Sequence, residues 1–221
     1  MRRKEQRSNF YQTFCKAEGN QHIASEYAIE KINGLVEKFR VKGILEVGLG
    51  IGSISGIVLT VKRDENLDYI GTEANDFCLK ALPKNLKEDY NRLQIYSDLT
   101  KIPADKKFDL IIIDGKDDKL QKIKDLIFEN GMLAIEGDRI PQQDSLQELF
   151  PNHKYVHCIS REKNKSFSPF PVAHWQGGLK VIFINPTVSQ KLWWIKEKIF
   201  TKLKYWFRKR DKTKKKLEVR S

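Results

Sequence analysis

Short apolar runs recur along the chain, and each is bounded by turn residues or by residues that start helices. The run at 110–113 is continuously apolar, which is typical of a strand buried on both faces. Amphipathic spacing over 22–39 predicts a helix before the first run. The predicted strands lie at 43–48, 68–72, 93–96, 108–113, 131–135, 154–159 and 179–184, with helices between the first five at 53–62, 75–88 and 117–129.

The order of these elements predicts the fold class. Strands that alternate with helices favour right-handed βαβ units, and hence a parallel sheet with helices on both faces. The last two strands are joined only by a long loop, 160–178, which predicts an antiparallel C-terminal hairpin at one edge of the sheet. This loop is rich in Ser, Pro and Gly, and we expect it to cover a site as a lid. The expected architecture is an α/β fold with a seven-stranded, mostly parallel sheet.

The sharpest chemical signal is the glycine-rich motif ILEVGLGIGS, which joins the first predicted strand to a helix. Gly48, Gly50 and Gly52 allow a tight turn and a close approach of the backbone to a ligand. A dinucleotide-binding motif would place a glycine at the position of Ser53. Glu46 lies two residues before the first glycine, where its carboxylate suits an ammonium group better than a pyrophosphate. A tight turn that binds no ligand is the alternative interpretation.

With this motif, residues 20–185 resemble the class I S-adenosylmethionine-dependent methyltransferases, which have a Rossmann-like fold. In that family an acidic residue after the second strand binds the ribose hydroxyls, and Glu73 has this position. Asp98 follows the third strand, where the adenine amino group is bound, and Asp114 ends the fourth strand beside the reacting methyl group. The resemblance implies a cofactor site made of Glu46, Gly48, Gly50, Gly52, Glu73, Ala74, Asp98 and Asp114.

The segments FDLIIIDGKDD and ENGMLAIEGDR resemble the small-molecule O-methyltransferases, the group around catechol-type enzymes and their bacterial relatives. Some members of that group bind a divalent metal through an Asp after strand four and an Asp-Asn pair after strand five. Asp114 matches the first position, whereas Glu136 and Asp138 lie near the second without forming the pair. A magnesium ion would suit such oxygen ligands chemically, but the sequence assigns no metal ligand.

Transfer of a methyl group to a protonated acceptor requires a base, and the resemblance leaves two candidates. Asp114 ends the fourth strand, and His174 lies in the expected lid loop. The N-P-P-[YF] motif of adenine N6-methyltransferases is absent from the sequence, as is a cysteine placed as cytosine-C5 enzymes require. We therefore expect an S-adenosylmethionine-dependent methyltransferase that acts on an oxygen of a small metabolite, a saccharide or a lipid-linked glycan. The alternatives are an RNA methyltransferase and a non-catalytic S-adenosylmethionine-binding protein.

The net charge of +12 on 221 residues is unevenly distributed. Residues 186–221 contain 13 basic and 3 acidic side chains, whereas residues 8–185 contain 24 basic and 25 acidic ones. The neutral body argues against a protein that coats nucleic acid along its whole surface. The division expected from these patterns is a basic N-terminal arm at 1–20, a methyltransferase domain at 21–186, and a basic amphipathic helix with a cationic tail at 187–221.

The segment 190–209 has a strong helical pattern in which eight large apolar residues fall within an arc of about 160°. Three interpretations remain open: a helix that lies on an anionic membrane surface through residues 190–216, a nucleic-acid-binding tail, or a helix packed on its own domain. The sequence has no apolar stretch long enough to cross a bilayer and no secretory signal, and its three cysteines suggest no disulfide framework. We expect a cytoplasmic protein that associates peripherally with the inner face of a membrane.

Overall fold

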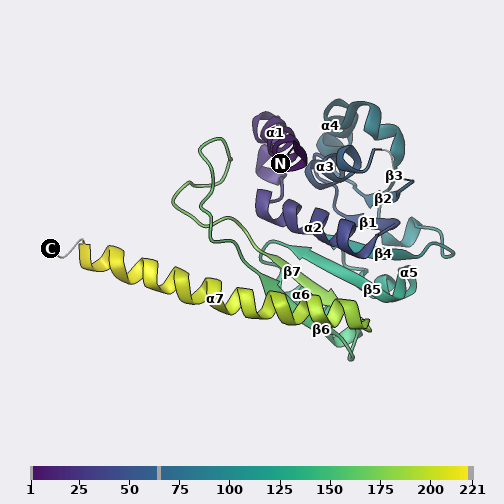
Figure 1. The fold of residues 1–221 in the computed structure, drawn as a ribbon. Helices are drawn as coiled ribbons and strands as arrows, with labels where there is room; N and C mark the ends of the chain where they lie inside the picture. The colour runs from purple at the N-terminus through teal and green to yellow at the C-terminus, as the bar shows by residue number, and fades with distance from the viewer. Residues whose placement is uncertain (1, 64–65, 219–221) are drawn as a thin grey trace.

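The computed structural model describes residues 2–63 and 66–218, and the side chains of residues 7–63 and 66–210. A seven-stranded sheet with the order β3-β2-β1-β4-β5-β7-β6 forms its centre (Figure 1). The strands are β1 (Gly43–Val47), β2 (Asp68–Thr72), β3 (Leu93–Tyr96), β4 (Phe108–Ile113), β5 (Ile127–Glu136), β6 (Lys154–Cys158) and β7 (Leu179–Phe183).

The pairing of the strands confirms the predicted topology. The first five strands run parallel to one another. Strand β7 pairs antiparallel with both β5 and β6, so the C-terminal hairpin closes one edge of the sheet. All five residues of β1 are buried, as expected for a central strand that is covered on both faces.

Helices cover both faces of the sheet, as predicted. Successive strand residues point to opposite sides, so the apolar strands place side chains on both faces that must be buried. Ile44 of β1 belongs to a core formed with the first four helices, whereas the next residue, Leu45, belongs to a second core formed with α5 and α6. The α-helices are α1 (Arg2–Lys16), α2 (Glu26–Phe39), α3 (Ser53–Val61), α4 (Asp76–Leu86), α5 (Ile123–Leu126), α6 (Ile140–Leu149) and α7 (Val188–Glu218). Short 3-10 helices lie at Asn20–His22, Lys87–Arg92, Leu99–Lys101 and Leu120–Lys122.

The segment 117–129 differs from the helix expected there. It contains a 3-10 turn and the four-residue helix α5, and β5 already begins at Ile127. Ile127 pairs with Phe108, and the ladder then shifts register before Leu110 pairs with Met132. The early start of β5 therefore depends on a pairing with β4 that the local sequence pattern does not reveal.

The N-terminal segment, expected as a basic arm, forms helix α1. Tyr11 and Phe14 of this helix are each 2% exposed, and both belong to the main core. A Cβ atom added to Gly56 of α3 would lie 2.9 Å from the Phe14 ring, so the two helices pack closely. The cysteines Cys15, Cys78 and Cys158 are all free and buried. Within the described residues, no helix has the length and apolarity needed to span a membrane.

Candidate functional site

The glycine-rich turn lies between β1 and α3, and its backbone requires glycine. Gly48, Gly50 and Gly52 have positive φ angles of 85°, 54° and 90°, which side chains disfavour. A Cβ atom on Gly48 would also lie 2.6 Å from the amide nitrogen of Gly115, which follows β4. The turn therefore brings the ends of β1 and β4 together, and leaves its own backbone accessible from the cavity side.

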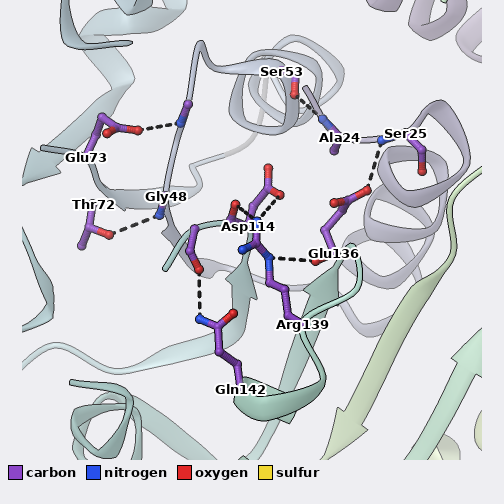
Figure 2. Close-up of polar contacts among 12 residues, drawn as sticks. Ala24, Ser25, Gly48, Ser53, Thr72, Glu73, Asp114, Glu136, Arg139 and Gln142 are labelled. Atoms are coloured by element: carbon purple, nitrogen blue, oxygen red, sulfur yellow. Dashed lines mark hydrogen bonds and ion pairs between the residues drawn. The ribbon is translucent and has the colours of Figure 1, made fainter. Parts of the chain in front are cut away.

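Glu73 holds its carboxylate against this turn (Figure 2). Its Oε2 atom accepts a hydrogen bond of 2.8 Å from the Gly50 amide. Its Oε1 atom accepts hydrogen bonds of 2.9 and 2.8 Å from the amides of Ala74 and Asn75. The side chain of Asn75 in turn caps α4 by accepting from the Cys78 amide. Because three backbone amides fix it, the Glu73 carboxylate is preorganised at the C-terminal end of β2.

A cavity of about 690 Å³ opens beside the turn, at the carboxyl ends of the parallel strands. Ligands of open α/β sheets bind at this edge, and the volume lies within the usual range for small-molecule sites. The lid loop contributes to the wall, as expected for 160–178. The polar and aromatic groups of the lining include His22, Ser25, Glu73, Asn75, Ser97, Asp114, Lys116, Asp117, Glu136, Arg139, Asn164, His174 and Trp175.

Two carboxyl groups meet in this cavity at the ends of β4 and β5. Burial raises the pKa of Asp114 well above its usual value, and the nearby charges of Glu136 and Glu46 raise it further. Burial also raises the pKa of Glu136, whose Oε1 atom accepts a hydrogen bond of 3.3 Å from the Ser25 amide. A buried carboxyl pair of this kind retains a proton at a higher pH than an exposed one, so it is suited to proton transfer.

Arg139 lies directly beside this pair (Figure 2). Its Nη2 atom is 3.6 Å from Oδ1 of Asp114 and also donates to the main-chain carbonyl of that residue. Its Nε atom donates a hydrogen bond of 3.0 Å to the carbonyl of Glu136. The guanidinium therefore joins the ends of β4 and β5 and lowers the pKa of both carboxyl groups, partly offsetting their burial.

Glu46 lies within β1 and is completely buried. It accepts a hydrogen bond of 2.5 Å from the Tyr69 hydroxyl, while its Oε1 atom has no hydrogen-bond partner. Burial raises its pKa to about 8. The described residues that line the cavity do not include Glu46, so the structure places its carboxyl group behind the wall.

The other expected site residues fall into two groups. Gly48, Gly50, Glu73, Ala74, Asp114 and His174 line the cavity, whereas Gly52 and Asp98 are not among the lining residues that the structure describes. The carboxylate of Asp98 caps the next turn by accepting hydrogen bonds from the hydroxyl and from the amide of Thr100, and these bonds lower its pKa to about 2. Ser97 and Asp117 line the cavity near this position instead.

The sequence reasoning did not assign site roles to Glu136, Arg139, Ser25 or Trp175. The available signal was the position of Glu136, which is the last residue of β5, much as Glu73 and Asp114 directly follow β2 and β4. Ser25 is the N-cap of α2, and its carbon and oxygen atoms approach the lid at Gly177. No periodic pattern connects α2 with the lid, so this contact follows only from the tertiary fold.

The residues of the site do not fit a divalent metal. Asp114 faces the Arg139 guanidinium, and a second cation between them would be repelled. Asp138 points elsewhere: its side chain is 88% exposed and lies 3.8 Å from the Lys180 ammonium. Among the residues described, no group of three or more His, Cys, Asp or Glu side chains is arranged to bind a metal ion.

Comparison with known proteins finds solved structures of similar fold. No protein-family model matches the sequence, and no curated protein sequence matches it. An O-methyltransferase from Bacillus cereus in complex with SAH is 15% identical, with 80% of this chain and 90% of that chain covered and a TM-score of 0.58. An SAH-bound methyltransferase from Podospora anserina is 14% identical, with 80% and 87% covered and a TM-score of 0.58.

A third similar structure is an O-methyltransferase from Streptomyces achromogenes in complex with SAM, with a TM-score of 0.52. It is 12% identical, and 70% of this chain and 78% of that chain are covered. The chain thus has the Rossmann-like fold of these SAM- and SAH-bound methyltransferases, two of which are O-methyltransferases.

Proposed function

We propose that this protein is an enzyme that transfers the methyl group of S-adenosylmethionine to an oxygen atom of a small molecule. The observation that carries the proposal is the Glu73 carboxylate, which three amides hold beside the glycine turn at the edge of the cavity. A carboxylate in this position accepts hydrogen bonds from a pair of hydroxyl groups, such as those of a ribose. The O-methyltransferases of similar fold support the same activity.

The cavity residues fit this cofactor chemically. The exposed backbone of Gly48 and Gly50 would approach its amino-acid portion, and Glu73 and Ala74 its ribose. Ser97 and Asp117 line the part of the wall where we propose that the adenine lies. Glu46 would act from behind the wall rather than by contact: burial keeps it mainly protonated, and a cationic ligand in the cavity would favour its ionisation. When bound, S-adenosylmethionine would supply an electrophilic methyl group.

The pair of Asp114 and Glu136 is the proposed acceptor of the proton that a hydroxyl acceptor loses. Both pKa values are raised, which makes the pair a stronger base than an exposed carboxylate. Arg139 keeps part of this pair ionised and is available to an anionic group of the acceptor. His174 lines the same cavity from the lid loop and is the second candidate base.

We propose a metabolite, a saccharide or a lipid-linked glycan as the acceptor. The polar and charged lining supports an acceptor with hydroxyl or carboxylate groups, since each buried polar group needs a partner. We also propose that the enzyme works in the cytoplasm, in peripheral contact with the inner face of a membrane. Support for this location comes from the exposed apolar side chains of helix α7.

Transfer of tritiated methyl groups into fractionated cell extract tests the function. Metabolite, glycolipid and RNA fractions are incubated separately with the wild-type protein, Asp114→Asn and the surface control Asp125→Asn. The proposal expects label in the metabolite or glycolipid fraction, with a loss of roughly a hundredfold in rate for Asp114→Asn and none for the control. Label confined to RNA, or no label in any fraction, would contradict it.

A further inference from the structure

Helix α7 binds the body of the protein through a mixed face, on which buried polar side chains lie between the partly buried Trp193 and Trp194. Gln190, Glu197 and Thr201 recur at helical spacing, and each is at most 9% exposed. The Gln190 side chain donates a hydrogen bond of 2.9 Å to the carbonyl of Asn130, and the Thr201 hydroxyl one of 3.0 Å to the carbonyl of His157. The carboxylate of Glu197 lies 2.8 Å from the ammonium of Lys31 on α2.

The opposite face of α7 is apolar and exposed to solvent. At 100° per residue six of its exposed apolar side chains fall within an arc of about 80°, and they extend over about 27 Å of the helix. The exposed Phe200 lies beside this arc. An amphipathic helix usually turns its apolar face toward the core, whereas these six side chains point away from it. We call these residues the apolar stripe: Val188 (73% exposed), Leu192 (64%), Ile195 (46%), Ile199 (55%), Leu203 (48%) and Trp206 (52%).

Basic side chains border the apolar stripe on both sides. Lys191, Lys198 and Lys202 lie along one border and Lys196 along the other, and all four are exposed. Glu197, the only acidic residue in the sequence between positions 188 and 210, faces the body. The exposed surface of the helix therefore combines apolar side chains with positive charge.

We propose that the apolar stripe binds to the surface of an anionic lipid bilayer, with the axis of α7 parallel to the membrane. A lipid surface accommodates a flat apolar face at the depth of the headgroups, where lysine side chains can reach anionic phosphates. A second copy of the chain fits less well. Two apposed stripes would bring together two tails in which residues 186–221 contain ten more basic than acidic side chains.

The position of α7 in the fold leaves this face accessible. The helix lies along the edge of the sheet beside β6, and its C-terminal turns extend past the body (Figure 1). Tyr155 of β6 accepts a hydrogen bond of 2.7 Å from the Trp194 indole, which fixes the rotation of the helix. Because the opposite face is held by the body, the apolar stripe is directed away from it.

The same helix contacts the lid loop of the cavity. Arg208 donates to the carbonyl of Ser160, and its guanidinium lies 4.8 Å from the ring of Trp175, which lines the cavity. Arg161 at the start of the loop lies 4.1 Å from the ring of Phe207. A helix bound to a membrane would thus hold the lid close to the lipid surface. This consequence rests on the proposed function, and it favours an acceptor that is itself attached to the membrane.

Sedimentation with lipid vesicles tests the binding without cofactor or acceptor, so its result does not depend on the proposed function. The full-length protein is mixed with vesicles of phosphatidylcholine alone, or of phosphatidylcholine with phosphatidylserine. The test variant is Ile195→Gln with Ile199→Gln, at two exposed positions of the stripe. The matched control is Phe128→Gln with Ile140→Gln, because these side chains are 47% and 53% exposed elsewhere on the surface.

We expect the wild type and the control to sediment with the anionic vesicles, and the stripe variant to bind at least roughly tenfold more weakly. Added salt should weaken the binding of the wild type, because the lysines contribute through charge. Equal sedimentation of the stripe variant and the wild type would overturn the proposal. The proposal would also fail if the wild-type protein stayed in the supernatant, or if it bound RNA but not vesicles. It would fail as well if the wild type formed a dimer and the stripe variant remained a monomer.

Discussion

The guanidinium of Arg139 lies 3.6 Å from the carboxylate of Asp114 inside the candidate site. Arg139 follows β5 and Asp114 follows β4, so this ion pair connects the ends of two adjacent parallel strands. It places a fixed positive charge at a point where Glu136 and Asp114 would otherwise repel each other. The pair thus sets both the charge of the cavity and the proton affinity of its two carboxyl groups.

Removal of this positive charge should change the pH dependence of methyl transfer. Because Arg139 lowers the pKa of Asp114, the variant Arg139→Gln should raise that pKa. The acidic limb of the kcat/KM profile, which reports ionisation of the base, should then move to higher pH. Lys122→Gln, at an exposed ion pair, is the control and should leave the profile in place. An unchanged acidic limb in Arg139→Gln would argue that this carboxyl pair is not the base.

The buried Glu46 should make the stability of the protein fall as the pH rises. Burial raises its pKa from 4.5 to about 8 in the folded state, so the unfolded chain loses the proton first. The contribution is therefore fully present below about pH 4.5 and is lost progressively up to about pH 8. Glu46→Gln retains an oxygen that accepts the hydrogen bond from Tyr69. It should reduce the slope of the free energy of unfolding against pH by up to about 1.4 kcal/mol per pH unit. Urea unfolding at several pH values measures this difference, and equal slopes would contradict it.

Gly48→Ala should disrupt the turn. The substitution places a side chain at a φ of 85° and 2.6 Å from the Gly115 amide nitrogen, so both the turn and the neighbouring strand end must move. We expect a loss of about 2 kcal/mol or more in the free energy of unfolding, together with loss of ligand binding. Gly34→Ala is the matched control, because a Cβ atom there has nothing within 4 Å and replaces a helical glycine. It should stabilise the protein by up to about 1 kcal/mol, and a similar loss in both variants would refute the argument.

The attachment of α7 should depend on Glu197. This side chain is buried beside Lys31, and its charge is close to Lys204 as well. Glu197→Ala would leave the charges of Lys31 and Lys204 near each other without the carboxylate between α2 and α7. We expect a cost of about 2 kcal/mol in the free energy of unfolding. Lys196→Ala, which removes an exposed charge from the neighbouring position, should have an effect below about 0.5 kcal/mol. Chemical unfolding of both variants measures the difference, and a neutral Glu197→Ala would mean that the helix is held in another way.

The strands, the parallel core and the C-terminal hairpin were predictable from the sequence because local patterns indicate them. Apolar runs such as 110–113 mark strands buried on both faces, and their alternation with helices restricts the topology. Long-range effects account for the differences. The start of β5 at Ile127 depends on pairing with Phe108, and the packing of α1 depends on the absence of a side chain at Gly56. Neither relationship leaves a periodic signal in the sequence.

Some residues of the candidate site could likewise be predicted from the sequence, whereas others are revealed only by the tertiary fold. Glu73 and Asp114 could be predicted because they end parallel strands, and such ends lie at one edge of a sheet. Arg139 could not, since its role depends on how the chain turns after Gly137, which has a φ of 74°. The apolar residues of α7 were recognisable as one face of a helix. Only the tertiary contacts of Gln190, Glu197 and Thr201 reveal that the opposite face binds the body.

Titration calorimetry with S-adenosylmethionine tests the central claim most directly, because the proposed enzyme must bind this cofactor at Glu73. Three proteins are compared: the wild type, Glu73→Gln, and Asp125→Asn, which removes a carboxylate from an exposed surface pair. We predict that the wild type and Asp125→Asn bind with equal affinity, and that Glu73→Gln binds roughly 10- to 100-fold more weakly, since charge-assisted hydrogen bonds are lost. Absence of binding by the wild type, or equal affinity in all three proteins, would contradict the proposed cofactor site.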